Sequence, residues 1–242
     1  MKTQIAIITP IPEMVLSVQK HTMLQKAVDR KKIEFHIVNL RDYGEGNYRQ
    51  IDDAPFGGGA GMVMMARPLF KAIEEAIHLV GGDDGLRIIY PSPQGEPWDQ
   101  NYAKENCALG KFIFICGHYK GIDERVIKRY VTHEFSLGDF VVTSGEMPGL
   151  IMIDSFVRLI PGVLNKIESA MTDTFSGDLL DAPYYTKPRK IEGMAVPEVL
   201  LTGHHKNIQN WKFKRQKEVT KKKRPDIWHN YLKLSKSEHS HE

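Results

Sequence analysis

The segment from residue 52 to residue 62 is the first in the chain whose residue types could do chemistry. It reads Asp52-Asp53-Ala54-Pro55-Phe56-Gly57-Gly58-Gly59-Ala60-Gly61-Met62, with four glycines in five residues. Glycine lets a ligand approach the backbone closely, and exposed amide N–H groups suit a phosphate or the edge of a base. The run matches neither the dinucleotide-binding fingerprint nor the P-loop, so on its own it is equally compatible with a flexible turn.

Three further segments carry Gly, Pro or polar residues at the ends of expected strands. They are Tyr90 to Gly95, Gly117 to Arg125 and Ser136 to Glu146. Ligands of α/β sheets usually bind at the carboxyl ends of the strands. Each segment alone could be ordinary turn chemistry, but three together predict a compact pocket built largely from backbone.

Motifs for a metal site or a serine nucleophile are missing from the sequence. The ten His residues show no His-Glu-x-x-His spacing, and there is no Gly-x-Ser-x-Gly segment. Cys107 and Cys116 are too few for a disulfide framework or a four-ligand zinc site. We expect both thiols in the core of a cytoplasmic protein, and no bound transition metal.

The elements that must position these loops alternate between strand and helix. Apolar runs predict strands at residues 4–8, 33–40, 86–90, 112–116 and 140–143. Helical spacing predicts helices at residues 13–30, 68–80, 97–109, 122–130 and 147–160. This alternation predicts an α/β domain with a parallel sheet and helices on both faces. The loop Arg41 to Gly61 has no obvious structure, and loops of that length are usually functional or disordered.

The chain is expected to contain two domains. Pro161 and Gly162 end the last helix of a first domain spanning residues 1–164, and residues 165–172 read as a linker. Residues 173–242 then form a small, mostly helical domain with helical patterning from Ile208 through Trp228 and a frayed tail from Ser235.

Charge is concentrated in the second domain. The 242 residues are 41% hydrophobic and 26% charged, typical of a globular protein with a real core. Residues 204–224 contain nine Lys or Arg and one Glu, a net of +8, so the rest of the chain carries −5 of the total +3. Such a segment could bind phosphates or be a solvated helix face. Neither a signal peptide nor a membrane span is expected, because no apolar run is long enough.

Taken in order, the motifs resemble one family. They are Pro12-Glu13-Met14, the Asp52 to Met62 run, Ser92-Pro93-Gln94-Gly95, Gly121-Ile122-Asp123-Glu124-Arg125, Asp154-Ser155, Arg158-x-Ile160-Pro161-Gly162-Val163-Leu164, Leu179-Leu180-Asp181-x-Pro183-x-Tyr185-Thr186-x-Pro188, Val196-Pro197-x-Val199-Leu200-Leu201-x-Gly203 and Ile208-x-x-Trp211. Over about residues 4 to 216 the chain resembles the bacterial tRNA (guanine-N1)-methyltransferases of the SPOUT superfamily.

The resemblance implies features that periodicity cannot show. It implies a deep trefoil knot in the C-terminal part of the first domain and an antiparallel homodimer whose active sites are each completed by the partner chain. It also implies S-adenosylmethionine as cofactor and, from similar enzymes, dependence on Mg²⁺, for which Asp52, Asp173 or Asp181 are candidates although no coordination pattern is readable. The implied cofactor-binding residues are Tyr90, Ser92, Pro93, Gln94, Gly117, Tyr119, Gly121, Ser136, Leu137, Gly138, Asp139, Phe140, Val141, Val142, Ser144, Gly145 and Pro148.

The implied reaction is methylation of N1 of the guanine at tRNA position 37, beside the anticodon, which supports maintenance of the reading frame. Guanine N1 carries a proton, so the transfer needs a general base near N1 and a donor where charge develops at O6. Asp173 matches the family's base and Arg158 its charge-stabilising arginine, although a helix N-cap is the alternative role for Asp173. The residues expected to contact RNA are Asp52, Gly57, Gly58, Gly59, His205, Trp211, Lys212, Lys214 and Arg215.

Two residues depart from the family's pattern. Lys120 stands where an acid is common, and Ser144 replaces the first glycine of a usual Gly-Gly-Glu. Lys120 puts one carboxylate contact in doubt, and Ser144 could narrow the cofactor pocket, because serine adopts positive φ less readily than glycine. The competing interpretations are therefore a ribose 2′-O-methyltransferase of the same superfamily and an RNA-binding relative that has lost catalysis.

Overall fold

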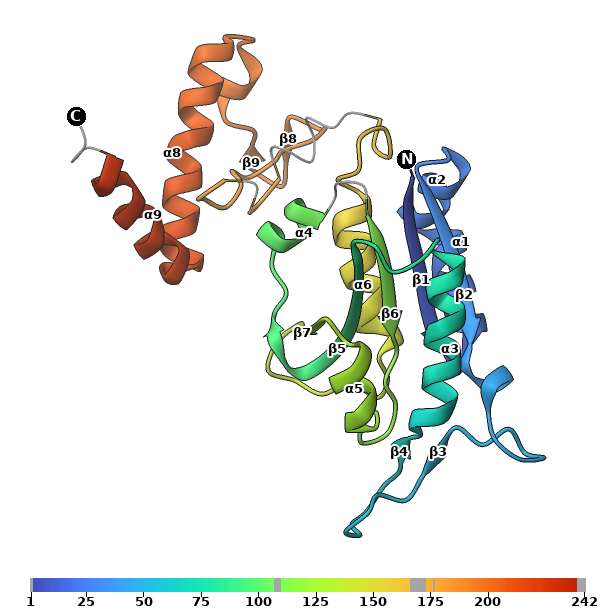
Figure 1. Cartoon of the computed structure of the whole chain (residues 1–242). Helices are drawn as coiled ribbons and strands as arrows, with labels where there is room; N and C mark the ends of the chain where they lie inside the picture. The colour runs from blue at the N-terminus through green and yellow to red at the C-terminus, as the bar shows by residue number, and fades with distance from the viewer. Residues whose placement is uncertain (1, 107–109, 166–172, 176, 239–242) are drawn as a thin grey trace. The chain divides into compact units, whose positions relative to one another are not determined.

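The computed structural model describes residues 2–106, 110–165, 173–175 and 177–238. The chain divides into two compact units, Met1–Ile167 and Glu168–Glu242 (Figure 1), and each is described here by itself. The division falls within residues 165–172, where a linker is predicted, and residues 166–172 lie outside the described part of the chain.

A five-stranded parallel sheet forms the centre of the first unit. The strands are β1 (Thr3–Thr9), β2 (Ile33–Asn39), β5 (Leu86–Pro97), β6 (Lys111–Ile115) and β7 (His133–Ser136). Their order is β2-β1-β6-β5-β7, and each neighbouring pair is parallel. The α/β class and the parallel sheet predicted from the sequence are confirmed.

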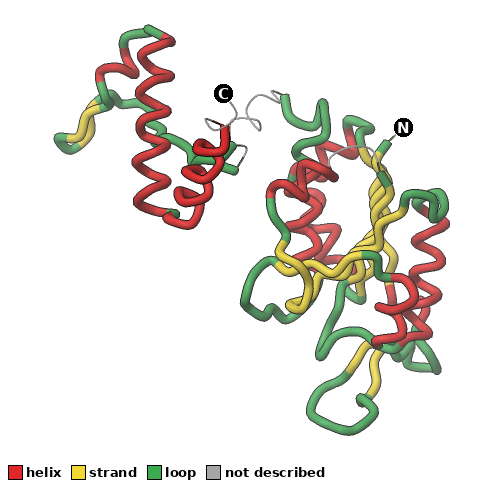
Figure 2. Tube along the Cα trace, turned by 60° about the vertical axis from the view of Figure 1, so that its left-hand side comes forward, coloured by secondary structure: helices red, strands yellow, loops and turns green. Residues whose placement is uncertain are grey.

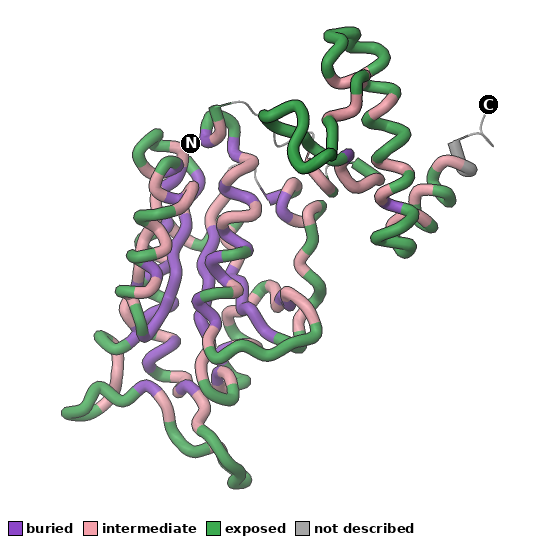
Figure 3. Tube along the Cα trace, turned by 180° about the vertical axis from the view of Figure 1, so that it is seen from behind, coloured by how far each residue is buried: buried purple, intermediate pink, exposed green. Residues whose placement is uncertain are grey.

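Helices cover both faces of this sheet (Figure 2). One face packs against α1 (Pro12–His21), α2 (Met23–Asp29), α4 (Gln100–Asn106) and α6 (Glu146–Val157), and the other against α3 (Ala66–Leu79) and α5 (Glu124–Tyr130). Side chains alternate between the two cores along each strand, with Ile5 and Ile7 on one side and Ala6 and Ile8 on the other. The strands are therefore buried on both faces (Figure 3), which explains their nearly continuous apolar runs.

The strand predicted at residues 140–143 is wrong. The fifth strand is β7, and Phe140 to Thr143 form an irregular loop in which Val141 is 84% exposed. The consecutive apolar residues suggested β-structure. Such residues favour a strand only where they pack against neighbouring strands, and residues 140–143 belong to no sheet in the described chain. The sequence reading also missed β7 itself, in which the polar residues His133 and Glu134 precede the buried Phe135 and Ser136.

Two long predicted helices are each broken in two. Residues 13–30 form α1 and α2, because Thr22 is extended and its Oγ1 accepts a hydrogen bond from Leu24 N at 3.4 Å, capping the second helix. Residues 208–228 fall in α8 (His205–Lys223) and α9 (Pro225–Glu238). Pro225 lacks an N–H and so begins a new helix rather than continuing the first.

The long loop predicted at residues 41–61 contains short elements. The 3₁₀ helix η1 (Leu40–Tyr43) is followed by β3 (Asp52–Asp53), which pairs antiparallel with β4 (Val63–Met64). The glycine-rich segment is therefore the end of a hairpin (Figure 1). The predicted helix at 97–109 begins only at Gln100, because β5 extends to Pro97, and residues 107–109 lie outside the described chain.

The second unit consists mainly of helices. It contains the hairpin β8 (Lys190–Ile191) and β9 (Met194–Ala195), the 3₁₀ helix η2 (Glu198–Leu201), α8 and α9. Thr220 is fully buried, accepting a hydrogen bond from Leu180 N at 2.9 Å and donating one to Gln216 O at 2.7 Å. The frayed tail expected from Ser235 is helical as far as Glu238, and the last four residues lie outside the described chain.

Candidate functional site

A cavity of about 300 Å³ lies at the carboxyl ends of β5, β6 and β7. Its walls contain the predicted cofactor-binding residues except Gln94 and Asp139, and Gln94 lines a smaller cavity nearby. The sequence reading missed Pro91, His118, Lys120, Phe135 and Thr143, which also line the cavity. The sequence offered one signal for these residues, because each lies between or beside predicted residues in the same loops.

Glycines allow the walls of this cavity to pack closely. A Cβ on Gly117 would lie 2.8 Å from Cε2 of Tyr90, and one on Gly145 would lie 2.6 Å from the backbone N of Gly117. Gly121 has φ of +119°, in the region that favours glycine. Tyr90 itself is nearly buried, and its burial, together with the charge of Glu134, raises the pKa of its hydroxyl.

Backbone hydrogen bonds join the loops of the cavity to one another. Gly145 N donates to Gly117 O at 2.8 Å, and Trp98 N donates to Ser136 O at 2.8 Å. The Ser136 hydroxyl accepts from Gly138 N and donates to Gly138 O, both at 3.1 Å. These hydrogen bonds connect and order the loops that form the cavity wall.

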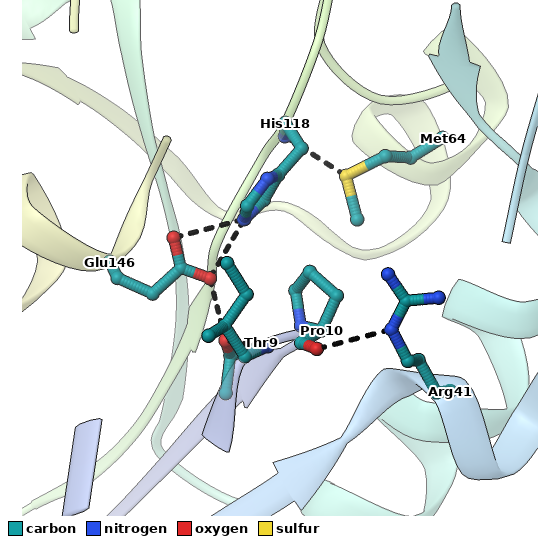
Figure 4. Close-up of polar contacts among 7 residues, drawn as sticks. Thr9, Pro10, Arg41, Met64, His118 and Glu146 are labelled. Atoms are coloured by element: carbon teal, nitrogen blue, oxygen red, sulfur yellow. Dashed lines mark hydrogen bonds and ion pairs between the residues drawn. The ribbon is translucent and has the colours of Figure 1, made fainter. Parts of the chain in front are cut away.

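Behind the wall lies a buried polar cluster (Figure 4). The carboxylate of Glu146 is within 2.9 and 3.0 Å of His118 Nε2 and accepts a 2.6 Å hydrogen bond from the Thr9 hydroxyl. Burial by itself would raise the pKa of Glu146, but hydrogen bonds from His118, Thr9 and Ser144 together lower it. Cys116 lies in the same core, where burial and the charge of Glu146 raise the pKa of its thiol.

The glycine-rich hairpin is bonded to one wall of the cavity. Met64 N donates to Gly121 O and Lys120 N donates to Met62 O, both at 3.0 Å. Asp52, in β3, pairs with Met64. At the end of the hairpin Phe56 is fully exposed, and Gly57, Gly58 and Gly59 have positive φ with nothing within 4 Å of an added Cβ. The hairpin therefore presents open backbone and one aromatic ring to solvent.

The two predicted catalytic residues lie in different units. Arg158 follows α6 in the first unit, and its charge partly offsets the rise in the pKa of Asp154 that burial causes. Asp173 is half-buried in the second unit, where its charge is among the factors that raise the pKa of Tyr184. Because the units are described separately, each residue is placed only within its own unit.

Cationic and aromatic side chains gather on α8, where the remaining RNA contacts were predicted. The guanidinium of Arg215 lies 5.7 Å from the Trp211 ring centroid, and Lys212 Nζ lies 6.0 Å from that of Tyr184. Arg215 also forms an ion pair with Glu218. His205, Lys212 and Lys214 are exposed on the same helix. This helix can offer positive charge and ring faces together.

Within the described residues, no three His, Cys, Asp or Glu side chains form a group that could hold a metal ion. The same part of the chain has no helix long and apolar enough to cross a membrane. Fold and cavity define an α/β protein with a cavity lined by loops at the carboxyl ends of a parallel sheet, where ligands of such folds usually bind.

Comparison with known proteins assigns the family. Residues 3–230 match the family model described as tRNA (Guanine-1)-methyltransferase TrmD. A protein of Brevibacillus brevis named tRNA (guanine-N(1)-)-methyltransferase is 44% identical over 224 residues, covering 93% of this chain and 90% of the relative. Proteins of the same name are 44% identical in Clostridioides difficile, covering 92% and 96%, and 41% identical in Desulforamulus reducens, covering 97% and 92%. The chain belongs to the tRNA (guanine-1)-methyltransferase family, which confirms the resemblance found in the motifs.

Proposed function

We propose that this protein transfers the methyl group of S-adenosylmethionine to N1 of the guanine at position 37 of tRNA, and so supports maintenance of the reading frame. The observation that carries the proposal is the loop-lined cavity at the ends of β5, β6 and β7 in a chain of this family. Its volume of about 300 Å³ lies within the range of small-molecule sites.

The cavity suits the methyl donor chemically. Leu137, Val142 and Pro148 give it an apolar lining, and the glycine-containing loops give it backbone polar groups that can orient an adenosine. S-adenosylmethionine, when bound, supplies an electrophilic methyl group on a sulfonium. The cofactor-binding set is the one predicted from the sequence, extended by the further residues of the cavity wall.

In the proposed chemistry, Asp173 accepts the proton from guanine N1 and Arg158 stabilises the negative charge that develops at O6. A carboxylate accepts a proton more readily when no cation is paired with it, so the proposal gives the base and the arginine separate positions on the substrate, N1 and O6. We include a homodimer in which each active site is completed by the partner chain, as the resemblance to the family implies.

The target base has to leave its stack to reach the donor. The hairpin with Asp52, Gly57, Gly58 and Gly59 is proposed to receive this base or its neighbour, because it is bonded to the cavity wall at Gly121. His205, Trp211, Lys212, Lys214 and Arg215 would bind phosphates and stack along the anticodon stem, which makes residues 173–242 a helical tRNA-binding domain joined by the linker 165–172.

The trefoil knot belongs to the same proposal. Two contacts support it: Glu96 and Pro97 pair alongside β7, and Trp98 Nε1 donates to Ser155 Oγ on α6 at 2.9 Å. The carboxyl end of β5 and the residue after it thus contact both β7 and the helix that follows β7. A cytoplasmic location is part of the proposal because the substrate is tRNA. Mg²⁺ would need ligands beyond the described side chains, such as substrate oxygens.

Methyl incorporation from labelled S-adenosylmethionine into unmodified tRNA transcripts tests the proposal. We expect label in a transcript with guanine at position 37 and none when only that guanine is replaced by adenine. Equal labelling of the two transcripts would contradict the position. Cofactor binding without any labelling would favour a relative that binds RNA but has lost catalysis.

A further inference from the structure

The carboxylate of Glu146 is a buried charged group that the proposed chemistry does not use. Glu146 is the first residue of α6 and is 0% exposed. Neither Glu146 nor Thr9 lines the cavity, whereas His118, Ser144 and Gly145 do. A buried carboxylate is costly unless its hydrogen bonds are satisfied, so the partners of this group are informative.

The partners come from separate parts of the chain and all donate to the carboxylate. Ile11 N donates to Thr9 Oγ1 at 2.9 Å, which leaves the hydroxyl hydrogen of Thr9 for Glu146 Oε1. His118 Nε2 lies within 3.0 Å of both carboxylate oxygens, so it must carry a hydrogen there. The cluster thereby ties the end of β1, the loop after β6 and the start of α6 together (Figure 4).

This connection reinforces the contacts between two walls of the cavity. His118 and Ser144 form an isolated bridge between the two loops, and Gly145 N donates to Gly117 O. The backbone of His118 is held as well, because its N–H donates to Met64 Sδ at 3.0 Å. Removal or neutralisation of the Glu146 carboxylate is therefore expected to shift the loops 117–121 and 136–145, because the His118 side chain cannot move independently of them.

We propose that Glu146 is a positioning residue for the methyl-donor site: held by Thr9, it fixes His118 and so the spacing of the two loops that would hold S-adenosylmethionine. The inference rests on the proposed function. A purely structural role predicts something different, namely lower stability with unchanged affinity for the donor in the folded fraction.

Two pairs of variants separate these roles, and neither Thr9 nor Glu146 itself lines the cavity. Thr9→Val removes the hydroxyl with little change of shape, and Thr9→Ser keeps it. Glu146→Gln removes the charge, and Glu75→Gln on the exposed surface of α3 is its matched control. Affinity of the full-length protein for S-adenosylmethionine and S-adenosylhomocysteine is measured by calorimetry, and thermal unfolding is measured without ligand.

We expect Thr9→Val and Glu146→Gln to weaken binding of both ligands roughly 10- to 100-fold, as loss of a hydrogen bond to a buried charge does. Thr9→Ser and Glu75→Gln should bind like the parent. If Thr9→Val folds, melts earlier and binds with parental affinity, the positioning role is wrong, and this holds even if Glu146→Gln does not fold. If the parent itself binds neither ligand, the proposed function falls and the inference falls with it.

Discussion

The cavity loops of the first unit and helix α8 of the second present their functional groups in opposite ways. In the cavity, backbone hydrogen bonds and closely packed glycines fix each group, and one added methyl group would collide with the neighbouring chain. On α8 the basic side chains are mostly exposed, and Thr220 is the buried residue of the helix. A site that binds one particular small molecule needs fixed geometry, whereas a surface that binds a polyanion needs mainly positive charge.

The largest effect on the methylation rate is expected at Asp173, the residue of the second unit that is proposed to act in the reaction itself. Asp173→Asn keeps the size of the side chain but removes the basic oxygen, so single-turnover methylation at saturating cofactor should fall by roughly 10²–10⁴-fold. Affinity for S-adenosylmethionine should not change, since the cavity residues all belong to the first unit. Arg158→Ala should also slow the transfer, and the two losses should combine non-additively if both act on one transition state. A near-parental single-turnover rate for Asp173→Asn would show that another group accepts the proton.

Replacement of Lys212, Lys214 and Arg215 by Gln together tests whether α8 acts through charge. Loss of three phosphate contacts should reduce the slope of log affinity for tRNA against log salt by about 2–3 and leave cofactor binding unchanged. The control removes the same charge from exposed positions of the first unit, with Gln at Lys20, Lys26 and Lys71. Equal losses in the two triple variants would show that only net charge matters, and the proposed RNA surface would then be wrong.

Gly145→Ala tests the fixed geometry of the cavity. The new Cβ would lie 2.6 Å from Gly117 N and 2.8 Å from Cys116 Cα, so backbone atoms must move and affinity for the donor should fall about tenfold or more. Gly149→Ala is the matched control, since its Cβ would lie 3.8 Å or more from its neighbours in the middle of α6. That variant should be as stable as the parent or more so, because alanine is the better helix former. Calorimetric titration and thermal unfolding of both variants decide between a rigid and an adaptable wall.

The pH dependence of stability distinguishes the buried cluster from the exposed helix. Hydrogen bonds lower the pKa of Glu146 in the folded protein, so its stabilising contribution is present above the ordinary glutamate pKa of about 4.3 and is lost as the pH falls through the lower folded value. The difference in unfolding free energy between the parent and Glu146→Gln should therefore shrink on acidification below about pH 4.3. A difference that stays constant from pH 6 to pH 3 would contradict an ionised Glu146.

Lys120 should give the smallest effect. It is exposed on the rim of the cavity, and its side chain lies against Gly61 of the hairpin. Its ammonium can contact an RNA phosphate, so Lys120→Glu should not raise turnover above that of the parent. Steady-state rates with tRNA check this, and a large gain would mean that the chain is not adapted to lysine at this position.

The sequence predicted the sheet and the walls of the cavity better than the elements between them. Strands such as Ile5 to Ile8 are buried on both faces and leave an unmistakable apolar run. Phe140 to Thr143 carry the same kind of run but line the cavity, and apolar composition cannot distinguish a strand from a loop that lines a cavity. The pairing of Glu146 with His118 and Thr9 joins residues up to 137 positions apart, and no local pattern encodes it.

The identity of the methylated atom tests the central claim most directly. A transcript with guanine at position 37 is incubated with the protein and S-adenosylmethionine, digested to nucleosides and compared by mass spectrometry and chromatography with 1-methylguanosine and 2′-O-methylguanosine standards. The account predicts 1-methylguanosine as the product, formed by the parent and almost lost with Asp173→Asn. Methylation of the ribose, or of guanine at an atom other than N1, would contradict it.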